Sequence, residues 1–304
     1  MKELDQCGLC PRECGINRNA CQAGYCGSGS GYEVASICIH HGEEPPISGI
    51  KGICNVFFSG CNLACVYCQN YQISRRKQKS GNIETTLEEV TARIITLLNE
   101  GIEAVGFVNP THFTPHVKEI IRSLNHQGYK PITVYNTNCF DKVDIVRSLE
   151  GLIDVYLPDF KYMDPILASR FSDAEIYPEI AKQALLEMYR QKGSTVVLNV
   201  SGHAATGMII RHLILPGQTD DSIRILEWIA AFLSPSVHIS LMSQYYPTVC
   251  VTGDPVLGRK VTVSEYKKVV DATERLGFHK GWIQDHESAI TYCPDFSNSN
   301  PFAF

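Results

Sequence analysis

The chain has 304 residues, of which 44% are hydrophobic and 19% are charged, the composition of an ordinary globular protein. Its net charge of −5 gives no electrostatic reason to expect nucleic acid or an anionic membrane as a partner. The start, MKELDQCGLC, lacks the hydrophobic core of a signal peptide, and no hydrophobic stretch approaches the length of a membrane span, so we expect a cytoplasmic location.

The first 50 residues are rich in cysteine and glycine and show neither helical nor strand periodicity. Ten of the thirteen cysteines lie at or before Cys68, and because disulfides are not expected in a reducing compartment, this density indicates metal or redox chemistry. We predict that residues 1–50 form a small, loop-rich, metal-binding segment and that residues 51–304 form a second unit. Four thiols with tight glycine turns between them offer ligands for zinc or for a second iron–sulfur cluster, and both metals fit the spacing of Cys7, Cys10, Cys14 and Cys26.

Beyond residue 50, short hydrophobic runs alternate with amphipathic segments, a pattern typical of strands separated by helices. We predict strands at residues 55–58, 104–108, 132–135, 153–157, 195–200, 208–215 and 237–242, with a turn at 201–207. Helices are predicted between Thr86, which starts a capping box, and Gly101, and at residues 116–125, 142–149, 178–191, 220–233 and 264–276. Because strands separated by helices need crossover connections, we expect an α/β fold with a mainly parallel sheet, a partial (β/α) barrel of six units.

In such barrels the chemistry lies in the loops that follow the carboxyl ends of the strands. The first of these loops carries Cys61, Cys65 and Cys68 in the spacing C-x3-C-x2-C. Three thiolates within eight residues can bind three corners of one compact cluster, whereas structural zinc requires a fourth ligand and ferredoxin motifs have four cysteines in another order. The trio therefore favours a [4Fe–4S] cluster with one iron left free for another ligand.

The same loop carries a family resemblance. With the aromatic Tyr67 before Cys68, after a hydrophobic strand and before Gln69 and Asn70, it resembles the signature of the radical S-adenosylmethionine (SAM) superfamily. The chain is most similar to the pyruvate formate-lyase activating enzyme branch, in particular to uncharacterised homologues with an extra N-terminal cysteine motif. The phrases CGLCPREC, HHGEEPPISG, FFSGCNLACVYCQNYQIS, FVNPTH and RHLILPG recur in that group, so the resemblance covers nearly the whole chain.

The resemblance implies that Cys61, Cys65 and Cys68 hold a [4Fe–4S] cluster and that the amino and carboxylate groups of SAM complete its open iron. Reduction of the cluster then cleaves SAM to a 5′-deoxyadenosyl radical, which abstracts hydrogen from a substrate. Tyr67 is expected to support the adenine, and simple packing is compatible with that role. The family pattern GGE after the second strand, which contacts the SAM amino group, is replaced by Asn109-Pro110-Thr111, so Asn109 or Thr111 is expected to take this role.

Three further positions of the family pattern bear on catalysis and on a bound cation. His112 is a candidate radical-site group, and a packed histidine that hydrogen-bonds its loop is an equal alternative. Asp159-Phe160-Lys161 resembles a D-x-K motif in which the lysine contacts the SAM carboxylate and the aspartate helps to hold a cation, although a lysine at a strand end can also extend to water. Asn136-Thr137-Asn138 matches a D-T-N stretch with Asn136 in place of aspartate, which removes a charge and puts the cation in doubt.

Two later loops complete the predicted site. Arg211 interrupts the hydrophobic run 208–215, where an unpaired buried charge would be costly, so we expect it to pair with the SAM carboxylate. Gln244 follows the last predicted strand and is expected to line the adenosine or substrate side.

The leading functional prediction is a radical SAM oxidoreductase that acts on a protein or peptide, including activation of a glycyl radical enzyme, with a flavodoxin- or ferredoxin-type reductant. The first alternative is radical modification of a small molecule or of a biosynthetic peptide. An alternative of another class is a non-catalytic iron–sulfur electron carrier or a zinc-binding protein.

Overall fold

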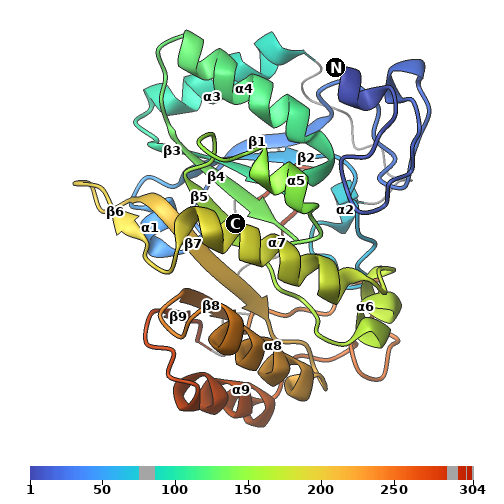
Figure 1. Cartoon of the computed structure of the whole chain (residues 1–304), viewed down its shortest axis with the longest axis vertical. Helices are drawn as coiled ribbons and strands as arrows, with labels where there is room; N and C mark the ends of the chain where they lie inside the picture. The colour runs from blue at the N-terminus through green and yellow to red at the C-terminus, as the bar shows by residue number, and fades with distance from the viewer. Residues whose placement is uncertain (75–85, 286–293, 299, 303–304) are drawn as a thin grey trace.

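The computed structural model describes residues 1–74, 86–285, 294–298 and 300–302. A nine-stranded sheet forms its centre, in the order β1-β2-β3-β4-β5-β7-β8-β9, with β6 paired to β7 (Figure 1). The strands are β1 Val34–His40, β2 Ile53–Phe58, β3 Ala104–Val108, β4 Ile132–Thr137, β5 Val155–Pro158, β6 Val197–Leu198, β7 Ala204–Leu213, β8 His238–Met242 and β9 Gly281–Ile283. The α-helices are α1 Pro45–Ser48, α2 Tyr71–Ser74, α3 Leu87–Asn99, α4 Thr114–His126, α5 Val143–Arg147, α6 Pro165–Ser172, α7 Tyr177–Lys192, α8 Thr219–Phe232 and α9 Val263–Arg275.

The sheet is parallel from β2 to β9 along this order, and only β1 and β6 pair antiparallel with their neighbours. Within the described residues the edge strands β1 and β9 do not pair with each other, so the sheet curves without closing. The prediction of a mainly parallel α/β fold, a partial (β/α) barrel, is confirmed.

Four strands depart from the sequence prediction. β1 is absent from it because its residues are buried on both faces, which leaves no alternation to detect. β7 begins at Ala204, inside the predicted turn at 201–207, and β6 covers only two of the residues 195–200. β9 is an additional parallel strand beyond the six predicted units. Because β1 joins the sheet, the segment before residue 50 supplies one strand to it, and the division of the chain at residue 50 stays a prediction.

The helices form where the sequence carries their start signals. The hydroxyl of Thr86 accepts from the backbone N–H of Glu89 while the Glu89 carboxylate accepts from the backbone of Thr86, the predicted capping box of α3. Gly101, with φ of +91°, then allows the chain to leave the helix. This cap and the buried hydrophobic face of α3 place the helix between β2 and β3.

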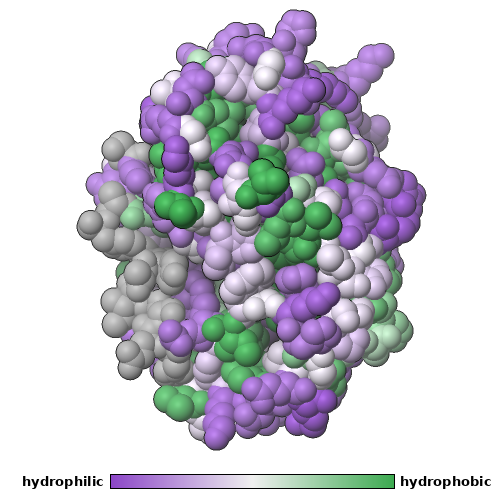
Figure 2. Space-filling view, turned by 90° about the vertical axis from the view of Figure 1, so that its left-hand side faces the viewer, coloured by the Kyte–Doolittle hydropathy of each residue, from purple (hydrophilic) through white to green (hydrophobic). Residues whose placement is uncertain are grey.

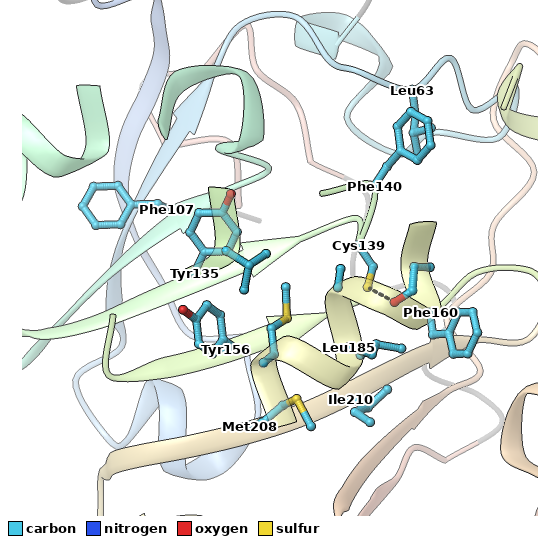
Figure 3. Packing of buried hydrophobic residues seen from close by; sticks show 14 of the residues in the cluster. Leu63, Phe107, Tyr135, Cys139, Phe140, Tyr156, Phe160, Leu185, Met208 and Ile210 are labelled. Carbon is cyan, nitrogen blue, oxygen red and sulfur yellow. Dashed lines mark hydrogen bonds between the residues drawn. The ribbon is translucent and has the colours of Figure 1, made fainter. Parts of the chain in front are cut away.

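The hydrophobic core lies in two layers on either side of the sheet. Between the sheet and α7, Tyr135, Tyr156 and Met208 lie on one side, together with Leu185 of the helix (Figure 3). On the inner side a smaller cluster fills the barrel at the amino ends of the strands and includes Ile47 of α1. Because the amino end of the barrel is filled, space for a ligand remains at the carboxyl ends of the strands.

The surface offers no extended hydrophobic face in the view of Figure 2, where hydrophobic residues form separate patches between hydrophilic ones. Within the described ranges, every helix is too short or too polar to cross a membrane.

Candidate active site

A cavity of about 230 Å³ that is open to solvent lies at the carboxyl ends of the strands. Small-molecule sites typically measure roughly 300–1,000 Å³, so this cavity is slightly smaller than a typical small-molecule site. Most of the predicted site residues line it: Cys61, Cys65, Tyr67, Cys68, Asn109, Asn136, Asn138, Asp159, Lys161, Arg211 and Gln244.

The cavity cysteines (Cys61, Cys65 and Cys68) lie on the loop that follows β2. Gly60 turns the chain into this loop with φ of +79°, and the Cys26 carbonyl stands so close that no larger side chain fits there. Each sulfur accepts a hydrogen bond from a neighbouring side chain: Cys61 from Nδ2 of Asn109 at 2.7 Å, Cys65 from Oγ of Ser172 at 2.9 Å, and Cys68 from Oγ of Ser74 at 3.3 Å.

Burial disfavours the ionisation of two of the cavity cysteines. Burial raises the pKa of Cys61 to about 12 and that of Cys65 to about 11, although Lys161 opposes the shift at Cys65. Thiolates at these positions therefore need the positive charge of a metal. Within the described ranges no three His, Cys, Asp or Glu side chains surround a single ion. In a four-iron cluster each thiolate binds a different iron, so the sulfurs do not converge on one point, and the donor set fits such a cluster.

A chain of hydroxyl groups connects the cavity wall to one of the sulfurs. The Tyr67 hydroxyl lies 2.5 Å from that of Tyr162, and Tyr162 lies 2.7 Å from Oγ of Ser172, which donates to Cys65. Sequence reasoning missed Tyr162 and Ser172, because Ser172 ends α6, a helix whose pattern was not recognised. The network holds Tyr67 against the cavity wall and adds a donor to the cluster ligand.

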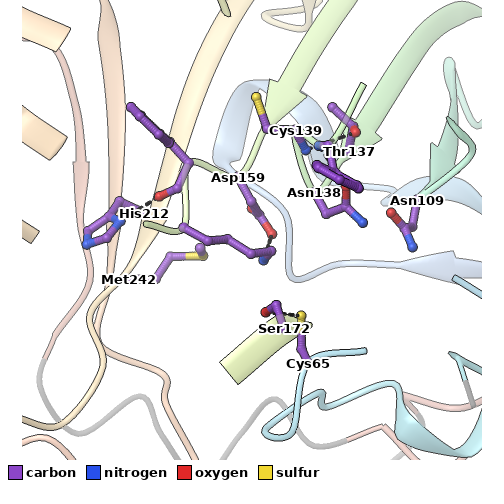
Figure 4. Close-up of polar contacts among 12 residues, drawn as sticks. Cys65, Asn109, Thr137, Asn138, Cys139, Asp159, Ser172, His212 and Met242 are labelled. Carbon is purple, nitrogen blue, oxygen red and sulfur yellow. Dashed lines mark hydrogen bonds and ion pairs between the residues drawn. The ribbon is translucent and has the colours of Figure 1, made fainter. Parts of the chain in front are cut away.

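Asn109 has a buried side-chain oxygen that can accept a hydrogen bond from a ligand. It follows β3 with φ of +51°, and its side-chain Nδ2 donates to Cys61. Its Oδ1 is buried, and no donor within the described residues reaches it. Because a buried carbonyl oxygen without a donor is costly, this atom fits the ammonium group of SAM. Figure 4 shows Asn109 beside Asn138, with Asp159 on the other side of Asn138 in this view.

Asp159 and Lys161 form an ion pair at the end of β5, with 2.8 Å between Oδ2 and Nζ. Burial opposes the charge of Lys161, but Asp159 outweighs it and raises the pKa of the lysine above its ordinary range. An ammonium group has three donors, so this pair leaves capacity for a ligand carboxylate. Asn138 also lines the cavity and donates through Nδ2 to Oδ1 of Asn62 at 2.7 Å and to the Cys61 sulfur at 3.6 Å.

Arg211 lines the cavity but already has carboxylate partners. Its Nε donates to Oε1 of Glu44 at 2.8 Å, its Nη2 donates to Oε2 of Glu44 at 2.9 Å, and Nη2 also pairs with Glu43. Burial opposes the ionisation of Glu43, but the charge of Arg211 outweighs burial and holds the pKa of Glu43 well below its usual range. Arg211 therefore does not depend on SAM for a carboxylate partner, and its contact with the SAM carboxylate stays a prediction. The two glutamates follow β1, in the phrase HHGEEPP, which was quoted for the resemblance without a role for its acidic pair.

Thr111 and His112 are the predicted site residues that do not line the cavity. Both are buried in a 3-10 turn, where Thr111 faces the Asp141 carboxylate and Nε2 of His112 lies 3.0 Å from the Ser59 carbonyl oxygen. Burial lowers the pKa of His112 to about 3, so its ring is neutral. The alternative of a packed histidine that holds its loop agrees with this placement.

The wall opposite the cysteine loop comes from the last part of the chain. Gln244 accepts at its backbone oxygen from Nε2 of Gln69 and at Oε1 from Nε2 of Gln284. Phe302 also lines the cavity, and its ring centroid lies 4.1 Å from that of His40 of β1, with the two rings tilted by 48°. The C-terminal segment thus contributes to the cavity next to the edge strand.

Comparisons with known proteins identify the family of the chain. The Radical SAM superfamily matches residues 55–229, more than half of the chain. The chain belongs to the radical SAM superfamily. It is 28% identical over 273 residues to an uncharacterized protein of Methanocaldococcus jannaschii, which covers 88% of this chain and 74% of that protein. It is 29% identical over 150 residues to 7-carboxy-7-deazaguanine synthase of Methanopyrus kandleri, which covers 41% of this chain and 60% of that protein.

Among solved structures, the chain is similar to a domain of pyruvate-formate lyase-activating enzyme from Bacteroides vulgatus. The TM-score is 0.39 at 16% identity, and the match covers 57% of this radical SAM chain and 93% of the other.

The Ser172–Cys65 hydrogen bond predicts a measurable effect on the cluster of this radical SAM protein. Ser172→Ala is expected to lower the reduction potential of the reconstituted cluster by roughly 40 mV. Hydrogen bonds to cluster sulfurs raise the potential, and one net bond of about 1 kcal/mol converts to that shift at ~59 mV per tenfold change in a one-electron equilibrium. A redox titration followed by electron paramagnetic resonance (EPR) measures it. Ser169→Ala, at an exposed position of the same helix, serves as the control, and equal potentials in both variants would contradict the prediction.

Proposed function

We propose that this radical SAM protein is an enzyme that acts on a protein or peptide, with a glycyl radical enzyme as the class of partner. The supporting observation is that three cysteines of one loop, Asn109 and Lys161 line a single cavity at the carboxyl ends of the strands. When bound, the reduced cluster supplies the electron that cleaves SAM to methionine and a 5′-deoxyadenosyl radical for hydrogen abstraction.

The residues of the chain would bind and orient the two cofactors. The cavity cysteines would hold the cluster, and Oδ1 of Asn109 would accept from the SAM ammonium group. Lys161, held by Asp159, would donate to the SAM carboxylate through its remaining donors. Tyr67 would support the adenine, since Tyr162 fixes its hydroxyl and its ring lines the cavity. These contacts would hold SAM close to the cluster and so favour its cleavage.

Access to the cavity bears on the substrate. The incomplete barrel leaves a side between β1 and β9 through which an extended peptide segment would enter, which supports a macromolecular substrate. The C-terminal Phe296 and Phe302 pack near Phe57 on this side and narrow it. This narrowing favours a second candidate, radical modification of a small molecule or biosynthetic peptide.

Deuterium transfer distinguishes these candidates. Protein prepared anaerobically and reconstituted with iron and sulfide is reduced in the presence of SAM and either a deuterated partner protein or a deuterated metabolite extract. Deuterium in 5′-deoxyadenosine from the partner protein is the expected result, and transfer only from the extract would favour the second candidate. Failure to cleave SAM at all would contradict both and would leave a non-catalytic metal protein, which needs no such cavity.

A further inference from the structure

A second set of cysteines lies outside the cavity, in the segment before β1. The N-terminal cysteines (Cys7, Cys10, Cys14 and Cys26) are spread over twenty residues, yet the fold gathers them. Cys7, Cys10 and Cys26 are buried, whereas Cys14 is exposed. Sγ of Cys14 lies 3.9 Å from the Cys7 carbonyl oxygen, and Cys7, Cys14 and Cys26 each contribute to the raised pKa of the buried Cys10 thiol. Within the described ranges no three of these side chains converge on a single ion, so the four thiols form a loose group with one member at the surface.

The backbone of this segment is shaped to hold the thiols together. The Cys7 N–H donates to the Ile16 carbonyl at 2.8 Å, and the Cys7 carbonyl accepts from Gly15 at 3.0 Å, which closes a loop around Cys10. Gly24 stands against the Cys14 sulfur, and an added Cβ there would lie only 2.6 Å from it. A side chain at residue 24 would displace the Cys14 sulfur. Glycine at this position therefore permits the backbone that leads to Cys26 to approach Cys14 closely.

The segment attaches to the barrel at the loop of the cavity cysteines. The Cys26 carbonyl lies against Gly60, 2.4 Å from where a Cβ would stand. Oγ of Ser28 donates to the Ser59 carbonyl at 3.2 Å, and Nε of Arg12 donates to the Asn62 carbonyl at 3.0 Å. These three contacts fall on the residues that flank Cys61. In Figure 1 the same segment, in dark blue, lies beside α2, which follows this loop.

We propose that the N-terminal cysteines bind a second iron–sulfur cluster that passes electrons to the cluster at the cavity cysteines, an inference that rests on the proposed function. A zinc ion needs four sulfurs that converge on one point, and among the described residues no three such side chains do so. In an iron–sulfur cluster the thiolates bind different irons, so the four thiols fit a cluster better. Electron transfer from such a cluster requires a short path to the cavity cysteines. Cys26 supplies that path, because its backbone contacts the residue that precedes Cys61.

The electrons balance in two one-electron steps. A one-electron carrier, a reduced flavodoxin or ferredoxin, is oxidised as it reduces the N-terminal cluster. That cluster then reduces the cavity cluster and returns to its oxidised state. Cys14, as the exposed member, marks the side on which the carrier docks.

The metal is tested in a full-length variant without the cavity cysteines, Cys61→Ala/Cys65→Ala/Cys68→Ala. We expect anaerobically purified and reconstituted protein to retain iron and acid-labile sulfide in a ratio of about 1:1 and to give a cluster EPR signal after reduction. Adding Cys10→Ala should abolish both, whereas adding Cys21→Ala, an exposed cysteine of the same segment, should not. Stoichiometric zinc without iron, or protein without metal, would overturn the proposal.

The electron path is tested in the otherwise unchanged chain with Cys10→Ala. The rate of SAM cleavage driven by reduced flavodoxin should fall about tenfold relative to the rate driven by dithionite, because a small reductant reaches the cavity cluster directly. If the ratio of the flavodoxin-driven rate to the dithionite-driven rate is unchanged, electron transfer through the N-terminal cysteines is contradicted, and the proposed function remains intact. Failure of the unmodified chain to cleave SAM with dithionite would instead contradict the proposed function, while the metal content of the triple variant would still decide the identity of the second site.

Discussion

Replacing any one of Cys61, Cys65 and Cys68 with alanine is expected to lower SAM cleavage at least ~10³-fold, to the background rate, because groups that act as a unit lose function together. For the same reason the triple variant is expected to be no less active than the single variants. The loss follows from the arrangement of the loop, where each sulfur has its own donor and none can substitute for another. The amount of 5′-deoxyadenosine formed after anaerobic reconstitution, together with iron content, measures the effect.

Cys250→Ala is the matched control for these variants. Cys250 is exposed and does not line the cavity, so its replacement should leave both iron content and SAM cleavage unchanged. A single cavity variant that keeps appreciable activity would show that the three thiols do not act together, and a loss in the control would point to general damage by cysteine replacement.

The sequence predicted most of the fold and the position of the site because both depend on local patterns. Alternating hydrophobic segments located all the barrel strands from β2 to β8 except β6, whose predicted length was wrong. The spacing of three cysteines within eight residues is also local, so the loop at Cys61 needed no knowledge of packing. β1 was missed because both of its faces are buried and its residues do not alternate.

The contacts around the cysteine loop lay beyond sequence reasoning because they join distant residues. Ser172 reaches Cys65 across 107 positions, and Asn109 reaches Cys61 across 48. Proximity to a strand end did identify Asn109 but did not separate it from His112 three residues later. The 3-10 turn that begins at Thr111 directs the His112 ring to the Ser59 carbonyl, away from the cavity, and only the backbone geometry shows this.

Arg211 illustrates a physical requirement that the sequence indicated without the partners that the structure shows. A guanidinium within a buried strand needs a carboxylate, and SAM was the expected source. The structure supplies two carboxylates from the loop after β1, Glu43 and Glu44. Arg211, Glu43 and Glu44 together carry one positive and two negative charges. Removal of the Arg211 guanidinium would therefore leave two buried carboxylates without their positive partner.

Arg211→Met is expected to lower the free energy of unfolding by about 3–5 kcal/mol, the usual cost of removing one partner from a buried ion pair. Arg211, Glu43 and Glu44 are all nearly inaccessible to water, so solvent would not compensate the two carboxylates left behind. Denaturant titration of the variant and the unmodified chain measures the difference. Arg224→Met is the matched control: the Arg224 side chain is half exposed and lies 3.9 Å from Asp164 and 3.5 Å from Asp221, so the expected change is below about 1 kcal/mol.

Neutralising the carboxylates distinguishes this structural role from one in SAM binding. If the cost of Arg211→Met comes from unpaired buried charge, then adding Glu43→Gln and Glu44→Gln should recover a large part of the lost stability, since an uncharged group needs no guanidinium. If Arg211 instead serves mainly to bind the SAM carboxylate, Arg211→Met should leave the unfolding free energy nearly unchanged and raise the dissociation constant for SAM, and the added substitutions should restore nothing. The bidentate contact with Glu44 favours the first outcome.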